Sequence, residues 1–191
     1  MHLSEKTLEV KEIFKGKILE LTHEKVELED GSTSYRELIH HPGGVCVVPI
    51  TDDGEIIFVE QFRYPYKKVL TEIPAGKLEK GENPRLCGIR ELKEEVGAEA
   101  SEFIYLGCLY PTVAYDTEII HMYMAKGLSF SGQKLDEGEF LDLKKIPLEK
   151  AYEMAVMNGL PDSKTQLAVM KAYAIEKGLV DKNAFLENVK E

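Results

Sequence analysis

The sequence lacks several features that mark particular classes of protein. Its three cysteines, Cys46, Cys87 and Cys108, are odd in number and have no CxxC spacing, so we expect free thiols rather than a disulfide framework. It has no apolar run near the roughly 18 residues of a membrane span, and its N-terminus has no apolar core of signal-peptide type. We therefore predict a cytoplasmic protein with no membrane partner.

Basic side chains are also fewer than acidic ones. The 191 residues include 24 Lys and Arg against 34 Asp and Glu, which gives a net charge of −10. This balance argues against nucleic acid as a partner, because binding to a phosphate backbone needs an excess of Lys and Arg. A smaller phosphate-containing ligand would need local Arg, Lys or a metal ion to offset the acidic field.

The segments that are present indicate a mixed α/β protein. Strand-like runs dominate up to residue 125, including β-branched stretches at 44–50 and 55–62, and helices are expected at 84–96, 148–159 and 162–178. We predict a small N-terminal antiparallel sheet in residues 1–41, with a hairpin turn at Asp30-Gly31, and a main domain in residues 42–191.

The helix expected at 84–96 is unusually acidic. Asn83 can cap its start, Pro84 suits its first position, and Gly97 can end it in the left-handed conformation. The helical period places an apolar side made of Leu86, Ile89, Leu92 and Val96, and an opposite side made of Glu91, Glu94 and Glu95.

Three carboxylates at this spacing repel one another, by roughly 0.2–0.5 kcal/mol per pair. A solvated charged face is one interpretation of the cluster. The other is a site for a divalent cation, since hard oxygen ligands that converge from one face suit Mg²⁺ or Mn²⁺. The residues before the helix bear on the choice.

Residues 76–98 read GKLEKGENPRLCGIRELKEEVGA. This stretch resembles the Nudix box, G-x5-E-x7-R-E-U-x-E-E-x-G-U, at every fixed position; only the last apolar U, a packing position, is changed, to Ala98. The resemblance implies a Nudix-type α/β/α sandwich with a mixed sheet. It also implies a divalent metal held by Glu91, Glu95 and Glu94 with the Ala75 carbonyl, and an Arg90 that orients a glutamate.

Further stretches are similar to ADP-ribose pyrophosphatases, among them VEQFRYP at 59–65, EIPAGK at 72–77 and DSKT at 162–165. The resemblance implies Mg²⁺-dependent hydrolysis of ADP-ribose to AMP and ribose 5-phosphate, with Mn²⁺ as an alternative metal. It also implies a homodimer built by the N-terminal strands. The partner is then a small nucleoside diphosphate sugar.

The same resemblance implies roles for residues outside the box. Arg63 offers a planar fork to a phosphate, and Glu118 lies beside the pocket. Tyr35 and Arg36 either contact the nucleobase or are strand residues that cover the sheet. Glu94 and Arg90 belong to the catalytic set together with Glu139, which matches the general base on a mobile loop. Glu137 is the alternative base.

One departure from the family affects the substrate. Val113-Ala114 stands where these enzymes usually have Pro-Gly, in a loop that lies near the terminal ribose. Another nucleoside diphosphate sugar, such as GDP-mannose, is therefore the alternative substrate. A non-catalytic Nudix-fold ligand sensor is the alternative from a different class, although such modules usually lose box residues that this chain keeps.

Overall fold

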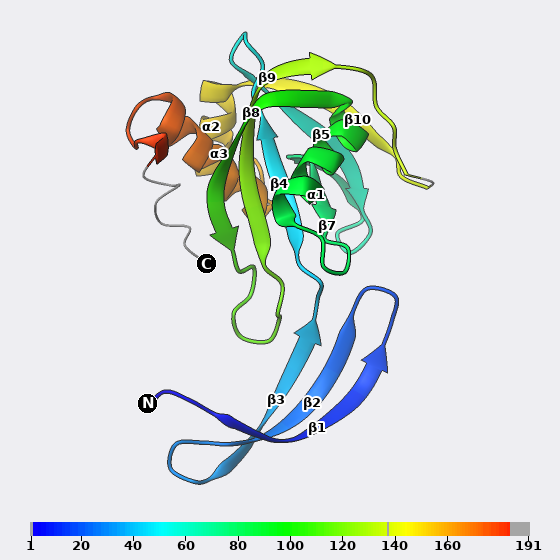
Figure 1. Cartoon of the computed structure of the whole chain (residues 1–191), viewed down its shortest axis with the longest axis vertical. Helices are drawn as coiled ribbons and strands as arrows, with labels where there is room; N and C mark the ends of the chain where they lie inside the picture. Colours follow the sequence, from blue (N-terminus) through cyan, green and yellow to red (C-terminus); the bar gives the residue numbers. More distant parts are fainter. Residues whose placement is uncertain (1, 137, 184–191) are drawn as a thin grey trace. The chain divides into compact units, whose positions relative to one another are not determined.

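A computed structural model of the chain describes residues 2–136 and 138–183. Figure 1 shows strands and helices in the following order: β1 (Lys6–Lys15), β2 (Glu20–Glu27), β3 (Thr33–His40), β4 (Gly44–Pro49), β5 (Glu55–Arg63), β6 (Lys68–Glu72), β7 (Ala75–Lys77), α1 (Pro84–Glu91), η1 (Leu92–Val96), β8 (Ala98–Leu109), β9 (Ile120–Phe130), β10 (Leu141–Pro147), α2 (Leu148–Val156) and α3 (Ser163–Glu176). Among the described residues, no helix is both long and apolar enough to span a bilayer.

The chain divides into two compact units. The first contains the residues up to Gly43 together with Tyr110–Ile119, and the second contains Gly44–Leu109 and the chain from Ile120 onward. The segment 110–119 joins the N-terminal strands in this division. The expected boundary between residues 41 and 42 stays a prediction.

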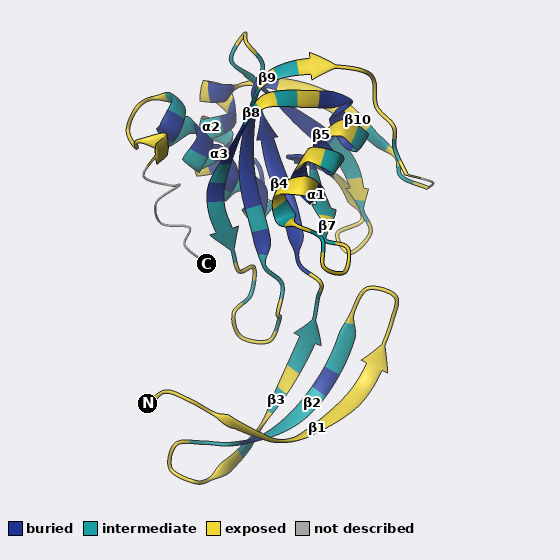
Figure 2. Ribbon diagram, viewed as in Figure 1, coloured by how far each residue is buried: buried dark blue, intermediate teal, exposed yellow. Residues whose placement is uncertain are grey.

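The first unit contains a three-stranded antiparallel sheet in the order β1-β2-β3. Gly31 has a φ of +82° in the turn between β2 and β3, and the Asp30 side chain accepts a hydrogen bond from Ser32 N at 2.9 Å. The expected small antiparallel sheet and its Asp30-Gly31 turn are therefore present. Strand β1 lies at the edge of the sheet and is exposed along its whole length (Figure 2).

The second unit contains a mixed sheet and a smaller antiparallel one. In the order β7-β4-β9-β8, strands β4 and β9 are parallel, whereas β7 and β8 run antiparallel to their neighbours. The other sheet has the order β10-β5-β6 and is antiparallel throughout.

Helices cover both faces of the mixed sheet. Successive residues of a strand point to opposite faces, and the residues of β4 divide accordingly between two hydrophobic clusters. Val45 and Val47 pack with residues of α1 and η1, such as Leu92, whereas Cys46 and Val48 pack with residues of α2 and α3. The expected mixed α/β fold with helices on both sides of a mixed sheet is confirmed, and the predicted box runs from β7 through α1 and η1.

Candidate active site

The predicted acidic helix begins and ends where the sequence indicates. The Asn83 side chain accepts hydrogen bonds from Arg85 N and Leu86 N, Pro84 takes the first helical position, and Gly97 has a φ of +69°. The last five residues, Leu92–Val96, form a π-helical turn instead of continuing the α-helix. Such turns are rare and are frequently found at functional sites.

The expected burial of this helix was partly wrong. Leu86 and Ile89 were placed on the packed side, but their exposed fractions are 62% and 39%. Glu91 and Glu95 were placed on the opposite side, for which a solvated face was one interpretation, yet they are only 9% and 2% exposed. The cause is the neighbouring strand β7, which accommodates carboxylates where the hydrophobic period predicts aliphatic side chains.

The carboxylates of Glu91 and Glu95 both lie against strand β7. A methyl group at Gly76 would lie 1.8 Å from Glu91 Oε1, so only a residue without a Cβ leaves room for this carboxylate. The backbone N–H of Ala75 donates a hydrogen bond to Glu95 Oε2 at 3.0 Å. Glu91 and Glu95, four residues apart, are thus both held against the strand that carries the Ala75 carbonyl.

Arg90 connects three carboxylates at this site. Its Nη1 donates to Glu91 Oε1 at 2.7 Å and to Glu94 Oε2 at 2.9 Å, and its Nε donates to Glu82 Oε1 at 3.1 Å. The hydrogen bonds from Arg90 to Glu82 are the largest cause of a raised pKa for this guanidinium. Arg90 therefore stays charged and fixes the orientation of Glu91, while Glu82 fixes Arg90. Sequence analysis matched Glu82 to the box but assigned it no role.

Burial makes the charged forms of Glu91 and Glu95 unfavourable. Burial raises the pKa of Glu95 to about 8, with further increases from Glu91 and Glu139 that a bond from Ala75 partly offsets. Burial also raises the pKa of Glu91, although Arg90 opposes this change. A cation beside them would remove the repulsion.

The donor set therefore fits a divalent metal. Carboxylate oxygens and a backbone carbonyl are the ligands that Mg²⁺ and Mn²⁺ prefer. Within residues 2–136 and 138–183, no group of three or more His, Cys, Asp or Glu side chains is already arranged to hold a metal. Binding would thus require Glu91 and Glu94 to turn from Arg90, or water to complete the coordination.

The loop between β9 and β10 carries Glu139 to this site. Glu139 is close enough to raise the pKa of both Glu91 and Glu95 by charge repulsion. Its backbone N–H donates to Asp136 O at 3.1 Å. Glu137, the alternative base, lies outside the described residues.

The start of this loop is bonded to the end of the acidic helix. Gln133 Nε2 donates to Glu95 O at 2.6 Å, Lys134 N donates to Glu94 O at 2.9 Å, and Ser131 N donates to Gly97 O at 2.7 Å. These bonds satisfy carbonyl groups that a helix end leaves free. Gln133 has no role in the sequence analysis, because no local pattern relates it to a helix that ends 37 positions earlier, at Val96.

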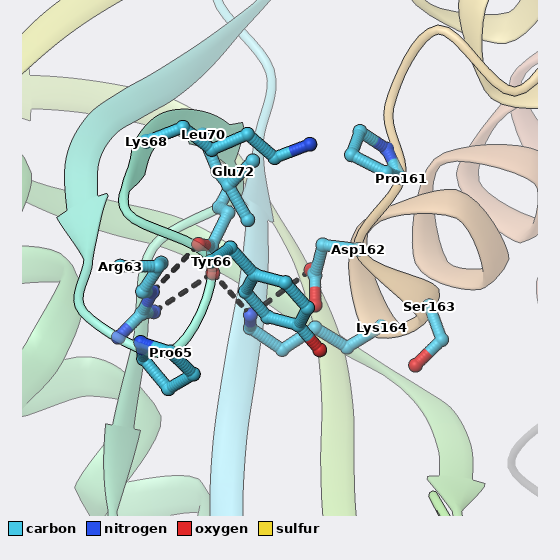
Figure 3. A pocket seen from close by; sticks show the side chains of 10 residues that line it. All are labelled: Arg63, Pro65, Tyr66, Lys68, Leu70, Glu72, Pro161, Asp162, Ser163 and Lys164. Carbon is cyan, nitrogen blue, oxygen red and sulfur yellow. Dashed lines mark hydrogen bonds and ion pairs between the residues drawn. The ribbon is translucent and has the colours of Figure 1, made fainter.

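Arg63 lies at the end of β5, in a cavity of about 490 Å³ (Figure 3). Its Nε and Nη2 donate to the two oxygens of Glu72 at 2.7 and 2.8 Å. Glu95 is among the groups that raise the pKa of Arg63, after the larger effect of its bond to Glu72. Arg63 is thus close to Glu95 of the acidic helix.

The remaining predicted residues belong to the first unit. Tyr35 and Arg36 line one hollow of this unit, where the Tyr35 ring is stacked on His23 with centroids 4.8 Å apart. The Arg36 guanidinium forms an ion pair with Glu5. Glu118 lies in the segment 110–119, with its Oε1 3.4 Å from His41 Nδ1.

Comparisons with known proteins identify similar sequences and a similar fold. The NUDIX domain family model matches residues 40–166. A methanol dehydrogenase activator of Bacillus methanolicus is 45% identical over 86% of this chain and 90% of its own, and an ADP-ribose pyrophosphatase of Bacillus subtilis is 42% identical over 87% and 91%. The crystal structure of an ADP compounds hydrolase has the same fold, with a TM-score of 0.79 and 21% identity over 94% of this chain and 97% of that one.

Proposed function

The chain belongs to the NUDIX domain family of hydrolases, and on that premise we propose that it hydrolyses the diphosphate bond of ADP-ribose to AMP and ribose 5-phosphate. The observation that carries the proposal is the pair of buried carboxylates, Glu91 and Glu95, which β7 and Arg90 hold in place despite the unfavourable raised pKa values. Two buried carboxylates with raised pKa values contribute little to stability. They suit the binding of a cation that in turn binds a diphosphate. The Bacillus subtilis relative supports the choice of ADP-ribose.

We propose Mg²⁺ as the metal, with Mn²⁺ as a substitute. The carboxylates of Glu91, Glu95 and Glu94 and the carbonyl of Ala75 would hold it. When bound, the cation would neutralise charge on the diphosphate and raise the acidity of nearby water.

The chain's own residues then have separate tasks. Arg63 donates hydrogen bonds to a non-bridging phosphate oxygen and so fixes the position of the diphosphate. A water molecule attacks one phosphorus, its proton passes to a carboxylate oxygen of Glu139, and the bond from that phosphorus to the bridging oxygen breaks. One phosphate remains on each product. Arg90 acts indirectly, by orienting Glu91 and Glu94.

Substitution of the base tests this assignment. We expect Glu139→Gln to lower kcat by about 10²–10⁴-fold with little change in KM, because a general base acts in the transition state and not in binding. Glu137→Gln should have a much smaller effect. The opposite ranking would assign the proton transfer to Glu137, and no effect from either change would return it to a box glutamate.

For the nucleobase, we propose contacts with Tyr35 and Arg36, and we place Glu118 beside the substrate. Tyr35 is 57% exposed, so its ring is available to a second aromatic group. Tyr35→Ala should therefore raise KM for ADP-ribose, and equal KM values for variant and wild type would remove Tyr35 from the site.

A panel of compounds separates the substrates. Purified protein with Mg²⁺ should release AMP from ADP-ribose faster than GMP from GDP-mannose, and a chelator should stop both reactions. Faster turnover of GDP-mannose would favour the alternative substrate that Val113-Ala114 leaves open. Tight binding without turnover of any compound would indicate a ligand sensor.

A second candidate function follows from the relative that is named a methanol dehydrogenase activator. At 45% identity over most of both chains, this chain could act on a dehydrogenase as its physiological target. Adding the protein with Mg²⁺ to such a dehydrogenase and measuring alcohol oxidation would test this candidate. A matched sample with Glu95→Gln would show whether any activation depends on hydrolysis.

We also propose a cytoplasmic homodimer that forms through the residues of the N-terminal sheet. Strand β1 carries exposed apolar side chains, among them Val10 at 57% and Phe14 at 59%, and its outer edge is open to another strand. The free thiols of Cys46, Cys87 and Cys108 suit a reducing compartment.

A further inference from the structure

Four charged side chains that line the cavity around Arg63 form a network. Glu72, from β6, accepts two bonds from Arg63 and a third from Lys164 Nζ at 2.5 Å. Lys164 also donates to Asp162 Oδ2 at 2.9 Å. Figure 3 shows Glu72 between the two cationic groups, with Arg63 on one side and the start of α3 on the other.

The network is mostly withdrawn from solvent. The side chains of Glu72 and Lys164 are 2% and 11% exposed, whereas Arg63 is 38% exposed. Burial alone would raise the pKa of Glu72, but the bonds from Arg63 and Lys164 outweigh it and lower this pKa. Burial would likewise lower the pKa of Lys164, but Asp162 and Glu72 reverse that effect. Arg63, Glu72 and Lys164 therefore carry their charges.

The two carboxylates of the network have different positive groups beside them. Asp162 caps α3 and accepts bonds from Thr165 N at 3.0 Å and Thr165 Oγ1 at 2.6 Å, so the positive end of the helix offsets its charge. Lys164 bonds to both carboxylates, and since the helix end offsets part of the Asp162 charge, Lys164 also offsets part of the Glu72 charge. Because Lys164 compensates part of the Glu72 charge, Glu72 cancels only part of the positive charge of Arg63.

We propose that Lys164 is a positioning residue for Arg63 and acts through Glu72. Glu72 fixes the plane of the guanidinium through its Nε and Nη2, and Lys164 keeps Glu72 from neutralising it. Without Lys164, an incoming phosphate would compete with an uncompensated buried carboxylate for the same guanidinium. The inference rests on the proposed role of Arg63 in binding the diphosphate.

A double-mutant cycle on ligand binding tests this inference. The affinity for ADP, measured by calorimetry with a chelator present, is compared for wild type, Lys164→Met, Arg63→Met and the double variant. We expect Lys164→Met to weaken ADP binding by about tenfold or more, as for the loss of a charged hydrogen bond. In the Arg63→Met background, the same change should have almost no further effect.

The inference also predicts a kinetic effect that is confined to KM. Lys164→Met should raise KM for ADP-ribose by a similar factor and leave kcat nearly unchanged, because Arg63 binds the diphosphate before and during the reaction. A merely structural role would lower kcat as well, or would lower the affinity equally in both backgrounds. Either result would overturn the inference, as would normal ADP binding by Arg63→Met.

A matched control lies at the other end of the same helix. Lys126 binds the Glu176 carboxylate of α3 at 2.7 Å, so Lys126→Met also removes a lysine that holds this helix. It should leave ADP affinity within about twofold of wild type. An equal loss from Lys126→Met would mean that the helix and not the charge network is responsible, which contradicts the inference.

One further variant and one further measurement keep the test decisive. If Lys164→Met does not fold, Lys164→Gln keeps a donor for the carboxylates without the charge and passes through the same cycle. If the wild type binds ADP but does not hydrolyse ADP-ribose, the proposed activity is wrong, while the cycle on ADP affinity still decides the role of Lys164.

Discussion

Replacing Glu95 by glutamine removes a buried charge and keeps the size of the side chain. Glu95 is 2% exposed, and its carboxylate accepts a bond from Ala75 N that the glutamine oxygen can also accept. Burial, with repulsion from Glu91 and Glu139, raises the pKa of Glu95 to about 8. The substitution therefore shows whether the fold needs only the size of this side chain and whether the metal needs its charge.

The sign of the effect follows from the two pKa values. In the folded chain the carboxyl keeps its proton to higher pH than in the unfolded chain, where its pKa is about 4.5. Between these values the folded state binds more protons, so the free energy of unfolding falls as pH rises from about 4.5 to about 8. The glutamine variant lacks this decrease.

The size of the effect has an upper limit. A shift from 4.5 to about 8 corresponds to about 5 kcal/mol at about 1.4 kcal/mol per pKa unit. Water that reaches the charged form and rearrangement around it reduce this value, so we expect a gain of about 2 kcal/mol for the variant at high pH. At low pH, where the wild-type carboxyl is already protonated, the gain should be close to zero.

Urea unfolding with a chelator, at about pH 5 and about pH 9, measures this difference. Glu99→Gln is the control, because Glu99 is exposed and its pKa is lowered by Lys93 instead of raised. With Mg²⁺ added, the wild type should gain stability and the Glu95 variant much less, and the variant should lose turnover. An equal gain at both pH values would refute the reasoning, because it would show that Glu95 does not titrate in this range.

Three other changes follow from the same geometry. Gly76→Ala should displace the Glu91 carboxylate and reduce turnover and Mg²⁺ affinity more than stability, as activity assays and thermal melts in Mg²⁺ and in chelator would show. Gly97→Ala should destabilise the protein in urea unfolding by more than about 1 kcal/mol, because a methyl group there is strained at positive φ and would lie 2.3 Å from the carbonyl carbon of Gly132. Light scattering at micromolar concentration should give the mass of a dimer, and Phe14→Glu should shift it toward the monomer; a monomeric wild type would contradict the proposed assembly.

The ends of the acidic helix could be predicted because their causes are local. Asn83 caps through a side chain two and three residues from its donors, and Gly97 ends the helix through its own φ. The strand expected at 44–50, which forms β4, was likewise predicted from the apolar residues of a short segment. Patterns of this kind are independent of the rest of the chain.

The burial of the carboxylates could not be predicted in the same way. A hydrophobic period assumes that charged residues face water, and functional sites are where this assumption fails. The helical period put Leu86 on the apolar side and Glu95 on the opposite side, but Leu86 is exposed and Glu95 is buried. Contacts between distant segments were missed for another reason: Lys164 and Glu72 are 92 positions apart, and Gln133 and Glu95 are 38 apart.

The two glycines that bound the acidic stretch show what the box encodes besides charge. Gly76 leaves the space that the Glu91 carboxylate occupies, and Gly97 leaves the space in which the backbone of Gly132 and Gln133 approaches the helix end. One glycine thus sets the position of a proposed metal ligand, and the other sets the start of the loop that carries Glu139. Because both contacts involve the absence of a side chain, a motif written as a list of charges accounts for only part of the site.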